Sequence, residues 1–358
     1  REEAIGTPSR ILQCNVHGNT MRTPLCVAFL TLGWTNIIAG FIIARDGRKS
    51  GIHTITTKVV RCNAFARQLQ SLSEHHVNAE AIESKVARPP EPLLSLPVGK
   101  SWKPFRDGPL EIIRICNDPD MFLLKEHIPH SEGRRALMDH AQAKGFKVAE
   151  TALGQREMRQ NSFSTWIDHN TDASSFGLYV AQGMTRMSAD LLLNELEYIA
   201  EPIQIVKYIE GGKFELHHDG LGRACTCLVY LNGVAGTWFP YAAVDPEDQS
   251  CVPREDAEGY PTSAGYTPGQ HGIWLAGSEA DPNLVRAAKE NHMVRVEPGD
   301  AVAFYNYKWV GEFDYYADTN GEQFVDHWRT CHVALPTDRE KWIATNWFKS
   351  THLPENEI

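Results

Sequence analysis

One short stretch of this chain, residues 208–232, constrains the fold and the chemistry more than any other: YIEGGKFELHHDGLGRACTCLVYLN. Its centre is His217-His218-Asp219. In a β-strand, side chains two residues apart point to the same face, so His217 and Asp219 would lie side by side while His218 points away. An imidazole and a carboxylate on one face are two of the three protein ligands in the facial triad that binds non-haem iron. The stretch therefore predicts a metal site built on a strand.

Strands are expected on both sides of this triplet. Residues 203–206 are rich in β-branched side chains, and the apolar run 228–231 follows the triplet. Gly211-Gly212 predicts a turn between them. A histidine and an aspartate at this spacing also occur as solvated residues beside a turn. The neighbouring residues are therefore needed to distinguish a metal site from that alternative.

Two phrases in this stretch match one known family. Residues 208–219 follow the pattern Y-x-x-G-G-x-F-E-x-H-x-D, and residues 223–232 follow R-x-x-T-x-L-x-Y-L-N. The chain resembles the prolyl 4-hydroxylase family of iron(II)/2-oxoglutarate dioxygenases, over roughly residues 110–350. The resemblance implies a mainly β, α+β fold: a double-stranded β-helix (jelly-roll) core flanked by N-terminal helices.

The resemblance also implies a third metal ligand, a histidine on a distant strand. His327 and His332 are both available, and the family places a proline four residues after its ligand. Pro336 stands in that position relative to His332. We therefore expect His217, Asp219 and His332 to bind the metal and to form the catalytic centre.

Three further residues are expected, by the same resemblance, to bind 2-oxoglutarate. Lys341, which opens a Lys-Trp pair nine residues after the third ligand, corresponds to the family lysine that holds the distal carboxylate. Arg339 is the alternative, since a guanidinium can pair bidentately with a carboxylate. Tyr208 corresponds to a family tyrosine that binds the same co-substrate, and Thr237 adds a hydrogen bond.

The implied reaction is hydroxylation of a peptidyl proline to 4-hydroxyproline, with iron(II), O2 and 2-oxoglutarate consumed to succinate and CO2 and ascorbate as a further cofactor. The motifs themselves encode iron and 2-oxoglutarate, not proline. Hydroxylation of a peptidyl lysine or a small molecule is therefore an alternative, as is an inactive binding module on the same fold. A zinc hydrolase would need a general base near the metal and would leave Tyr208 and Lys341 unexplained.

Three segments are expected along the chain. Residues 1–100 form an N-terminal region, with an uncharged span at 25–44 long enough for a membrane anchor and a polar linker after it. The dioxygenase domain covers 104–352, with a long insertion at about 241–292 that is rich in Pro, Gly, Asp, Glu and Ser. An anchor of this kind, with the family's use of the secretory pathway, suggests the endoplasmic reticulum or another secretory membrane.

The composition restricts which kinds of partner and metal site the chain is expected to have. Lys+Arg 35 against Asp+Glu 45 gives a net charge of −10 without a long basic run, which argues against nucleic acid. Eight cysteines without a C-x-x-C pair argue against a zinc finger or a disulfide scaffold. Cys225 and Cys227 share one strand face and are expected to be small buried hydrophobes. The sequence leaves the oligomeric state open.

Local patterns predict further elements before the central stretch. Helices are expected at 131–143, with Ser131 as N-cap, and at 187–196. Strands are expected at 110–115, 146–148 and 158–166. In the third of these, Arg159, Ser162 and Trp166 match the family pattern R-T-S-x-x-x-W, with one residue inserted after Arg159, and we give Arg159 no catalytic role. After the insertion, a strand, a Pro-Gly turn and a second strand are expected at 293–306.

Overall fold

The structure is a computed structural model, and it describes residues 26–30, 39–43, 88–150, 158–193, 198–243, 251–257, 261–278, 280–309, 324–350 and 353. The chain divides into two compact units, Arg1–His76 and Val77–Ile358. In the first unit, β1 (Cys26–Leu30) pairs antiparallel with β2 (Ala39–Ile43). The rest of the predicted 25–44 span, and residues 44–87 of the predicted linker, lie outside the described residues. Among the residues that are described, no helix is long and apolar enough to cross a membrane.

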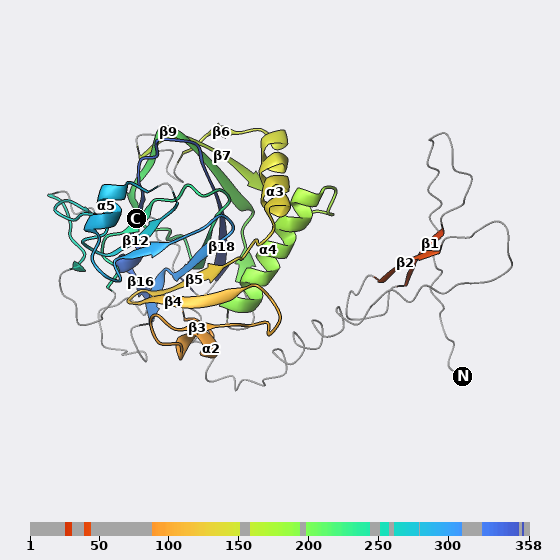
Figure 1. The fold of residues 1–358 in the computed structure, drawn as a ribbon, viewed down its shortest axis with the longest axis horizontal. Helices are drawn as coiled ribbons and strands as arrows, with labels where there is room; N and C mark the ends of the chain where they lie inside the picture. Colours follow the sequence, from red (N-terminus) through yellow and green to blue (C-terminus); the bar gives the residue numbers. More distant parts are fainter. Residues whose placement is uncertain are drawn as a thin grey trace. The chain divides into compact units, whose positions relative to one another are not determined.

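The second unit is built on one sheet of fourteen strands (Figure 1). Its path runs β13-β12-β11-β17-β9-β18-β10-β14-β5-β4-β3, while β7 pairs with β6 and β9, and β8 pairs with β18. The strands are β3 (Ser101–Trp102), β4 (Glu111–Asn117), β5 (Asp120–Lys125), β6 (Lys147–Val148), β7 (Arg159–Ile167), β8 (Tyr198–Ala200), β9 (Ile203–His217), β10 (Arg223–Tyr230), β11 (Thr237–Phe239), β12 (Ile273–Ala276), β13 (Met293–Arg295), β14 (Ala301–Tyr305), β17 (His332–Ala334) and β18 (Lys341–Ser350). The short pair β15 (Tyr307–Trp309) and β16 (Phe324–Asp326) stands apart from this sheet.

The described helices are few and short. They are α2 (Glu91–Leu94), α3 (Ser131–Lys144), α4 (Phe176–Leu192), α5 (Pro282–Ala287) and the 3-10 turn η4 (Trp328–Thr330). Antiparallel pairs dominate the curled sheet, and β12 and β13 are its one parallel pair among the described strands. The predicted mainly β jelly-roll fold with helices before the core is confirmed.

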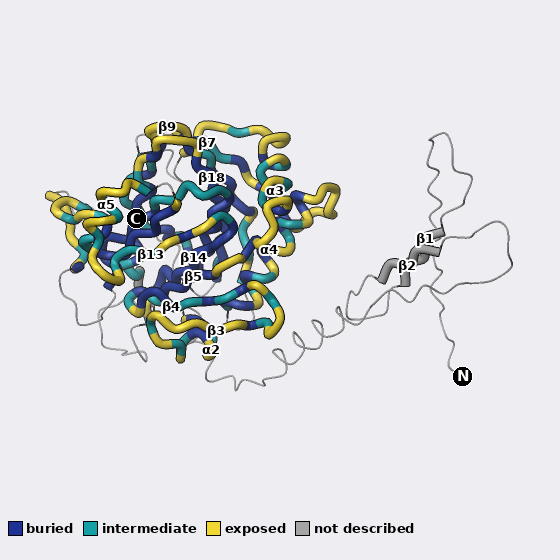
Figure 2. The backbone as a smooth tube through the Cα atoms, in the orientation of Figure 1, coloured by how far each residue is buried: buried dark blue, intermediate teal, exposed yellow. Residues whose placement is uncertain are grey.

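Alternation along β10 separates two cores. Cys225, Cys227 and Val229 face one cluster of buried side chains, and Leu228 and Tyr230 face the other. The buried residues follow the strands of the sheet, and one cluster of them includes residues of the helices that cover it (Figure 2). The two cysteines are free and buried, as the sequence predicted.

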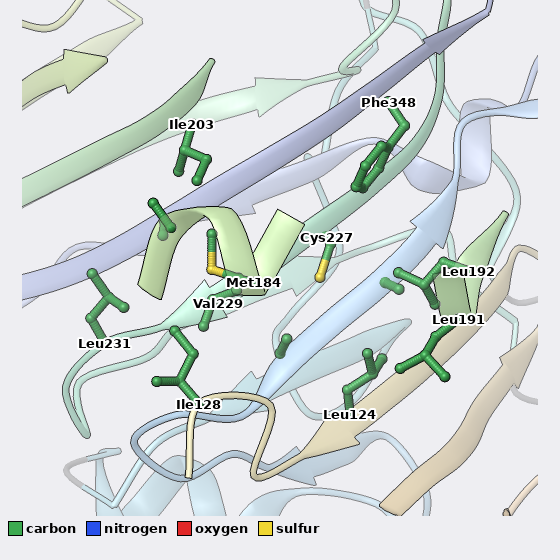
Figure 3. Close-up of a cluster of buried hydrophobic side chains, with 14 of the residues drawn as sticks. Leu124, Ile128, Met184, Leu191, Leu192, Ile203, Cys227, Val229, Leu231 and Phe348 are labelled. Atoms are coloured by element: carbon green, nitrogen blue, oxygen red, sulfur yellow. The ribbon is translucent and has the colours of Figure 1, made fainter. Parts of the chain in front are cut away.

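The helix-side core joins α3 and α4 to the sheet. Met184, Leu191 and Leu192 of α4 pack against Ile203 and Phe348 of the sheet (Figure 3). Each such side chain contributes roughly 1.5–3 kcal/mol on full burial. Because this face is closed by helices, the opposite face of the same strands is the one that can hold a cavity.

Several predicted elements are corrected. The helix expected at 187–196 is the end of α4, which begins at Phe176 and ends at Leu192. Ser175 caps it by accepting a hydrogen bond from the amide of Leu178. The N-cap of α3 is His130, not Ser131. Part of the expected insertion at 241–292 belongs to the sheet, since β12 pairs with β11 and β13, and its residues 244–250, 258–260 and 279 lie outside the described residues.

The predicted turn at Gly211-Gly212 is wrong, because β9 continues through both residues. Gly211 has a φ of +74°, a conformation that favours glycine. Before this bend β9 pairs with β18, and after it β9 pairs with β17. Hydrogen bonds to Thr337 hold the bend, since the Gly211 amide donates to the Thr337 carbonyl (2.7 Å) and the Thr337 amide donates to the Gly212 carbonyl (3.3 Å). β9 thus links two parts of the sheet, since it pairs with β18 in one and with β17 in the other.

We expect Gly212→Ala to destabilise the fold by about 1–3 kcal/mol. An added Cβ would lie 2.6 Å from the carbonyl oxygen of Ile209 and 2.8 Å from that of Asn161. Chemical denaturation would measure the loss. Gly183→Ala is the matched control, because this exposed position in α4 has nothing within 4 Å of the added Cβ, and there the change should stabilise by about 0.5–1 kcal/mol. Equal stabilisation by both variants would contradict the tight bend.

Candidate active site

Three metal-binding side chains meet where β9 and β17 pair. His217, Asp219 and His332 each offer one ligand atom, and these atoms lie within 4.8 Å of one another. His217 ends β9, His332 begins β17, and the two residues are directly opposite in the ladder. Asp219 follows two residues after His217 and is buried. The strand pairing therefore brings together the three residues that the sequence selected.

Backbone carbonyls orient both imidazoles. Nδ1 of His217 lies 2.8 Å from the carbonyl oxygen of Glu215, and Nδ1 of His332 lies 2.9 Å from that of Thr330. A carbonyl only accepts hydrogen bonds, so each Nδ1 carries the proton and donates. The Nε2 atoms are therefore the ones presented as ligands, in the arrangement that outer hydrogen bonds give to metal-binding histidines.

A chain of hydroxyl and amide groups orients the carboxylate. Thr226 Oγ1 donates to Oδ2 of Asp219 (2.7 Å), and Nδ2 of Asn306 donates to Thr226 Oγ1 (3.0 Å). The other carboxylate oxygen, Oδ1, lies 3.8 Å from Nε2 of His217. One oxygen of Asp219 is thus held by the protein, and the other faces the imidazoles.

The charge states suit a divalent cation. Burial alone would raise the pKa of Asp219, but His332, His217 and Arg223 lower it below its ordinary value. Burial, followed by the neighbouring His332, lowers the pKa of His217 well below its ordinary value. A neutral imidazole and an ionised carboxylate are the protonation states that metal binding requires. Two imidazoles and one carboxylate fit the facial donor set of non-haem iron(II).

These residues line a narrow cavity of about 30 Å³ that opens to solvent. Six of its fourteen lining residues belong to the core on the inner face of the sheet: Val206, Tyr208, Phe214, Leu228, Ala334 and Ile343. The lining residues are Arg159, Gln204, Val206, Tyr208, Phe214, His217, Asp219, Leu228, Thr237, His332, Ala334, Ile343, Thr345 and Trp347.

The residues expected to bind 2-oxoglutarate lie in or beside this cavity. Tyr208 and Thr237 line it, and Thr237 Oγ1 accepts a hydrogen bond from the hydroxyl of Tyr230 (3.0 Å). Lys341 is fully buried directly opposite Tyr208 in the β9–β18 ladder, with Nζ 4.4 Å from the centre of the Tyr208 ring. Nζ donates to the Leu335 carbonyl over 3.4 Å, and burial lowers the pKa of Lys341 to about 7. Such an ammonium is poised to pair with a carboxylate.

Curated sequences similar to this chain are prolyl 4-hydroxylases. The chain is 26% identical over 223 residues to transmembrane prolyl 4-hydroxylase of Mus musculus, a match that covers 53% of this chain and 37% of that protein. The same protein of Homo sapiens is also 26% identical over 223 residues. The match thus spans little more than a third of the relatives' own length. These two relatives are therefore what part of this chain is similar to.

The curated relatives and the assembled triad support a chain similar to the prolyl 4-hydroxylase-like iron(II)/2-oxoglutarate dioxygenases. No protein-family model matches the chain. Among solved structures, the viral collagen prolyl hydroxylase of Paramecium bursaria Chlorella virus-1, in its 2-oxoglutarate complex, is 16% identical with a TM-score of 0.39, covering 66% of this chain and 99% of that one.

The other candidates in this dioxygenase-like chain lie elsewhere. Nε2 of His218 lies 3.1 Å from the carbonyl oxygen of Asn306, and His218 does not line the cavity. His327 pairs with Asp118 at 3.1 Å and is not among the clustered ligands. The side chain of Arg339 is 53% exposed and pairs with Asp338 at 3.5 Å. Both alternatives that the sequence left open thus lie outside the cavity.

One lining residue, Arg159, was given no role from the sequence. It pairs with Phe214 across β7 and β9, so both side chains enter the cavity. The residue inserted relative to the family pattern shows as a bulge: the ladder shifts register between Gln160 and Ser162, and Asn161 has a φ of +46°. The inserted residue was the available signal, because a bulge re-aims its neighbours.

His332→Ala should abolish stoichiometric iron(II) binding, and His327→Ala should retain it, because only His332 supplies a ligand atom to the cluster. Anaerobic calorimetry would measure both. Retained iron(II) binding in His332→Ala with loss in His327→Ala would reverse the assignment.

Thr226→Val should weaken iron(II) binding by about 10–100-fold, since Asp219 loses the hydroxyl that orients it. The same calorimetry would measure this loss.

Proposed function

We propose that the protein hydroxylates a peptidyl proline to 4-hydroxyproline, consuming O2 and 2-oxoglutarate and releasing succinate and CO2. The observation that carries this proposal is the cavity in which His217, Asp219 and His332 meet Tyr208, with Lys341 buried beside it. A metal triad alone fits several chemistries. A buried cation close to that triad adds a place for a dicarboxylic 2-oxo acid.

His217, Asp219 and His332 would hold iron(II), which supplies the coupling of 2-oxoglutarate decarboxylation to hydroxylation of an unactivated C–H bond. The carbonyls of Glu215 and Thr330 orient the two histidines, and the Thr226 hydroxyl orients Asp219. The opposite side faces the cavity and is left for co-substrate and O2. An apolar wall keeps water away from the reacting groups, which strengthens each electrostatic contact there.

Lys341 would bind the distal carboxylate of 2-oxoglutarate, with Tyr208 and Thr237 completing its contacts. Placing the cation in a water-excluded site makes the pairing stronger than it would be at the surface. Support for Lys341 over Arg339 comes from burial: the first is 1% exposed, and the side chain of the second is 53% exposed. Support for proline as the substrate comes from the name of the curated relatives.

Further parts of the proposal concern the membrane anchor, the domain bounds and the location of the protein in the cell. We propose residues 25–44 as a membrane anchor and 104–352 as the catalytic domain, with residues 241–292 as a substrate-facing insertion. The protein would then lie in the endoplasmic reticulum or another secretory membrane, with ascorbate keeping the iron reduced. The relatives' name, which includes the word transmembrane, supports the anchor.

Succinate release by purified protein with iron(II), ascorbate and 2-oxoglutarate should rise when a proline-rich peptide is added, and the peptide should gain one oxygen atom on proline. Mass spectrometry and succinate quantification would measure both. Asp219→Ala is the control without turnover. Succinate without peptide stimulation would keep the dioxygenase and discard proline as substrate, whereas no succinate with iron bound would favour an inactive binding module.

Affinity for 2-oxoglutarate should fall as the pH rises above about 7, because burial lowers the pKa of Lys341 to about 7 and only its protonated form attracts a carboxylate. Below this pKa the ammonium is already charged, so affinity should be flat there. Above it, each pH unit should cost up to about tenfold, since binding must take up a proton. Titrations of metal-free protein would measure this.

Lys341→Arg is the matched variant, because a guanidinium stays protonated throughout this range. Its affinity for 2-oxoglutarate should show no such slope, whatever its absolute value. The same slope in both proteins would exclude Lys341 as the titrating group.

A further inference from the structure

Arg159 is a half-buried cation whose Nε and Nη1 atoms are buried, and the proposed reaction assigns it no role. Its guanidinium carbon lies 3.9 Å from the centre of the Phe214 ring, and Phe214 in turn stacks on His217 with ring centres 3.6 Å apart. This stack fixes the guanidinium beside the metal ligands, inside the cavity. Its position is set by the ladder between β7 and β9, where Arg159 and Phe214 are directly paired.

The guanidinium lacks the partners that a buried cation requires. Its Nε and Nη1 atoms are buried without a hydrogen-bond partner, and no ion pair of Arg159 is found in the described part of the chain. Leaving a buried donor unpaired costs about 1–3 kcal/mol, and more for a charged group. An arginine stays protonated in proteins, so it cannot escape this cost by losing its proton. A carboxylate entering the cavity would accept from one of these two nitrogens together with Nη2, because the two forks of a guanidinium are Nε/Nη2 and Nη1/Nη2.

Arg159 and Lys341 lie in different surroundings. Burial lowers the pKa of Arg159, whereas the nearby Tyr208 and Asp219 raise it. The guanidinium lies over Phe214, which stacks on the metal-ligand candidate His217. Lys341 lies against the Tyr208 ring, and only its burial shifts its pKa. Arg159 thus lines the cavity together with the triad, whereas Lys341 is buried against the Tyr208 ring and is not a lining residue. Two cations in different places suit a ligand with a carboxylate at each end.

We propose that Arg159 binds the carboxylate of 2-oxoglutarate that adjoins its 2-oxo group, while Lys341 binds the distal one. This inference rests on the proposed function, since it assigns a residue to the same co-substrate. A guanidinium with two free donors pairs bidentately with a carboxylate, and in a dry site such a pair is strong. Arg159 would then favour ligands that carry a carboxylate beside the oxo group over ligands that lack it.

Three small probes separate the two ends of the co-substrate. The first is 2-oxoglutarate itself. The second, 2-oxopentanoate, keeps the 2-oxo acid and lacks the distal carboxylate. The third, 4-oxopentanoate, keeps the distal carboxylate and has a methyl group in place of the carboxylate beside the oxo group. Dissociation constants on metal-free full-length protein, from calorimetry or tryptophan fluorescence, report binding without any turnover.

Arg159→Met should weaken 2-oxoglutarate and 2-oxopentanoate by about 10–100-fold and leave 4-oxopentanoate unchanged. Lys341→Met should show the opposite preference, weakening 2-oxoglutarate and 4-oxopentanoate. Arg186→Met is the matched control for loss of one arginine, because that side chain is 78% exposed on α4, and it should change none of the constants. Arg159→Lys keeps the charge without the fork and should fall between wild type and Arg159→Met.

Each outcome decides between the two proposals. Wild-type protein that binds no 2-oxoglutarate would overturn the proposed function together with this inference. Binding that is weakened by Lys341→Met and not by Arg159→Met would overturn this inference alone. Equal losses of 2-oxopentanoate and 4-oxopentanoate in Arg159→Met would also overturn it, because Arg159 would then act on the whole cavity and not on one carboxylate. Unfolding of Arg159→Met moves the comparison to Arg159→Lys, where the ratio of the two monocarboxylate constants distinguishes the same outcomes.

Discussion

The structure depends on one strand that belongs to two parts of the sheet. β9 pairs with β18 before Gly211 and with β17 after it, so the bend brings His217 opposite His332. The left-handed backbone at Gly211 and the close approach of Gly212 to its neighbours permit the bend only for glycine. Without it the two histidines would sit on separate, diverging strands. The metal centre is therefore a consequence of backbone geometry before it is one of side-chain chemistry.

Unpaired charged groups in and beside the cavity lower the stability of the fold when no ligand is bound. The half-buried cation Arg159 and the buried carboxylate Asp219 line the cavity, and the buried cation Lys341 lies beside it against the Tyr208 ring. Desolvation of unpaired charge opposes such an arrangement, and the lowered pKa of Lys341 is one sign of it. A divalent cation and a dicarboxylate together neutralise these groups, so binding and folding stability are linked here by mass action.

Local rules predicted much of this site. The spacing of His217 and Asp219 predicted their shared face, and the resemblance selected His332 over His327. In the structure His332 lies with the other two ligand residues, and its role stays a prediction. Tertiary context decided the rest. A Gly-Gly pair predicts a turn when only the neighbouring residues are considered, but the pairing with β17 and the hydrogen bonds to Thr337 keep β9 continuous. Sequence could not give Arg159 its place, because that depends on a bulge in β7 and on Phe214 across the ladder.

The two halves of the cavity differ in how firmly the protein holds them. Backbone carbonyls fix Nδ1 of both histidines, and Thr226 fixes one oxygen of Asp219. The metal ligands are thus oriented before any ion arrives. The cations are not fixed in this way: Arg159 leaves two donors unpaired, and Lys341 makes one long hydrogen bond. Their geometry is completed by the anion they bind. The metal half is therefore formed in advance, and the co-substrate half takes its final form on binding, which favours metal before 2-oxoglutarate.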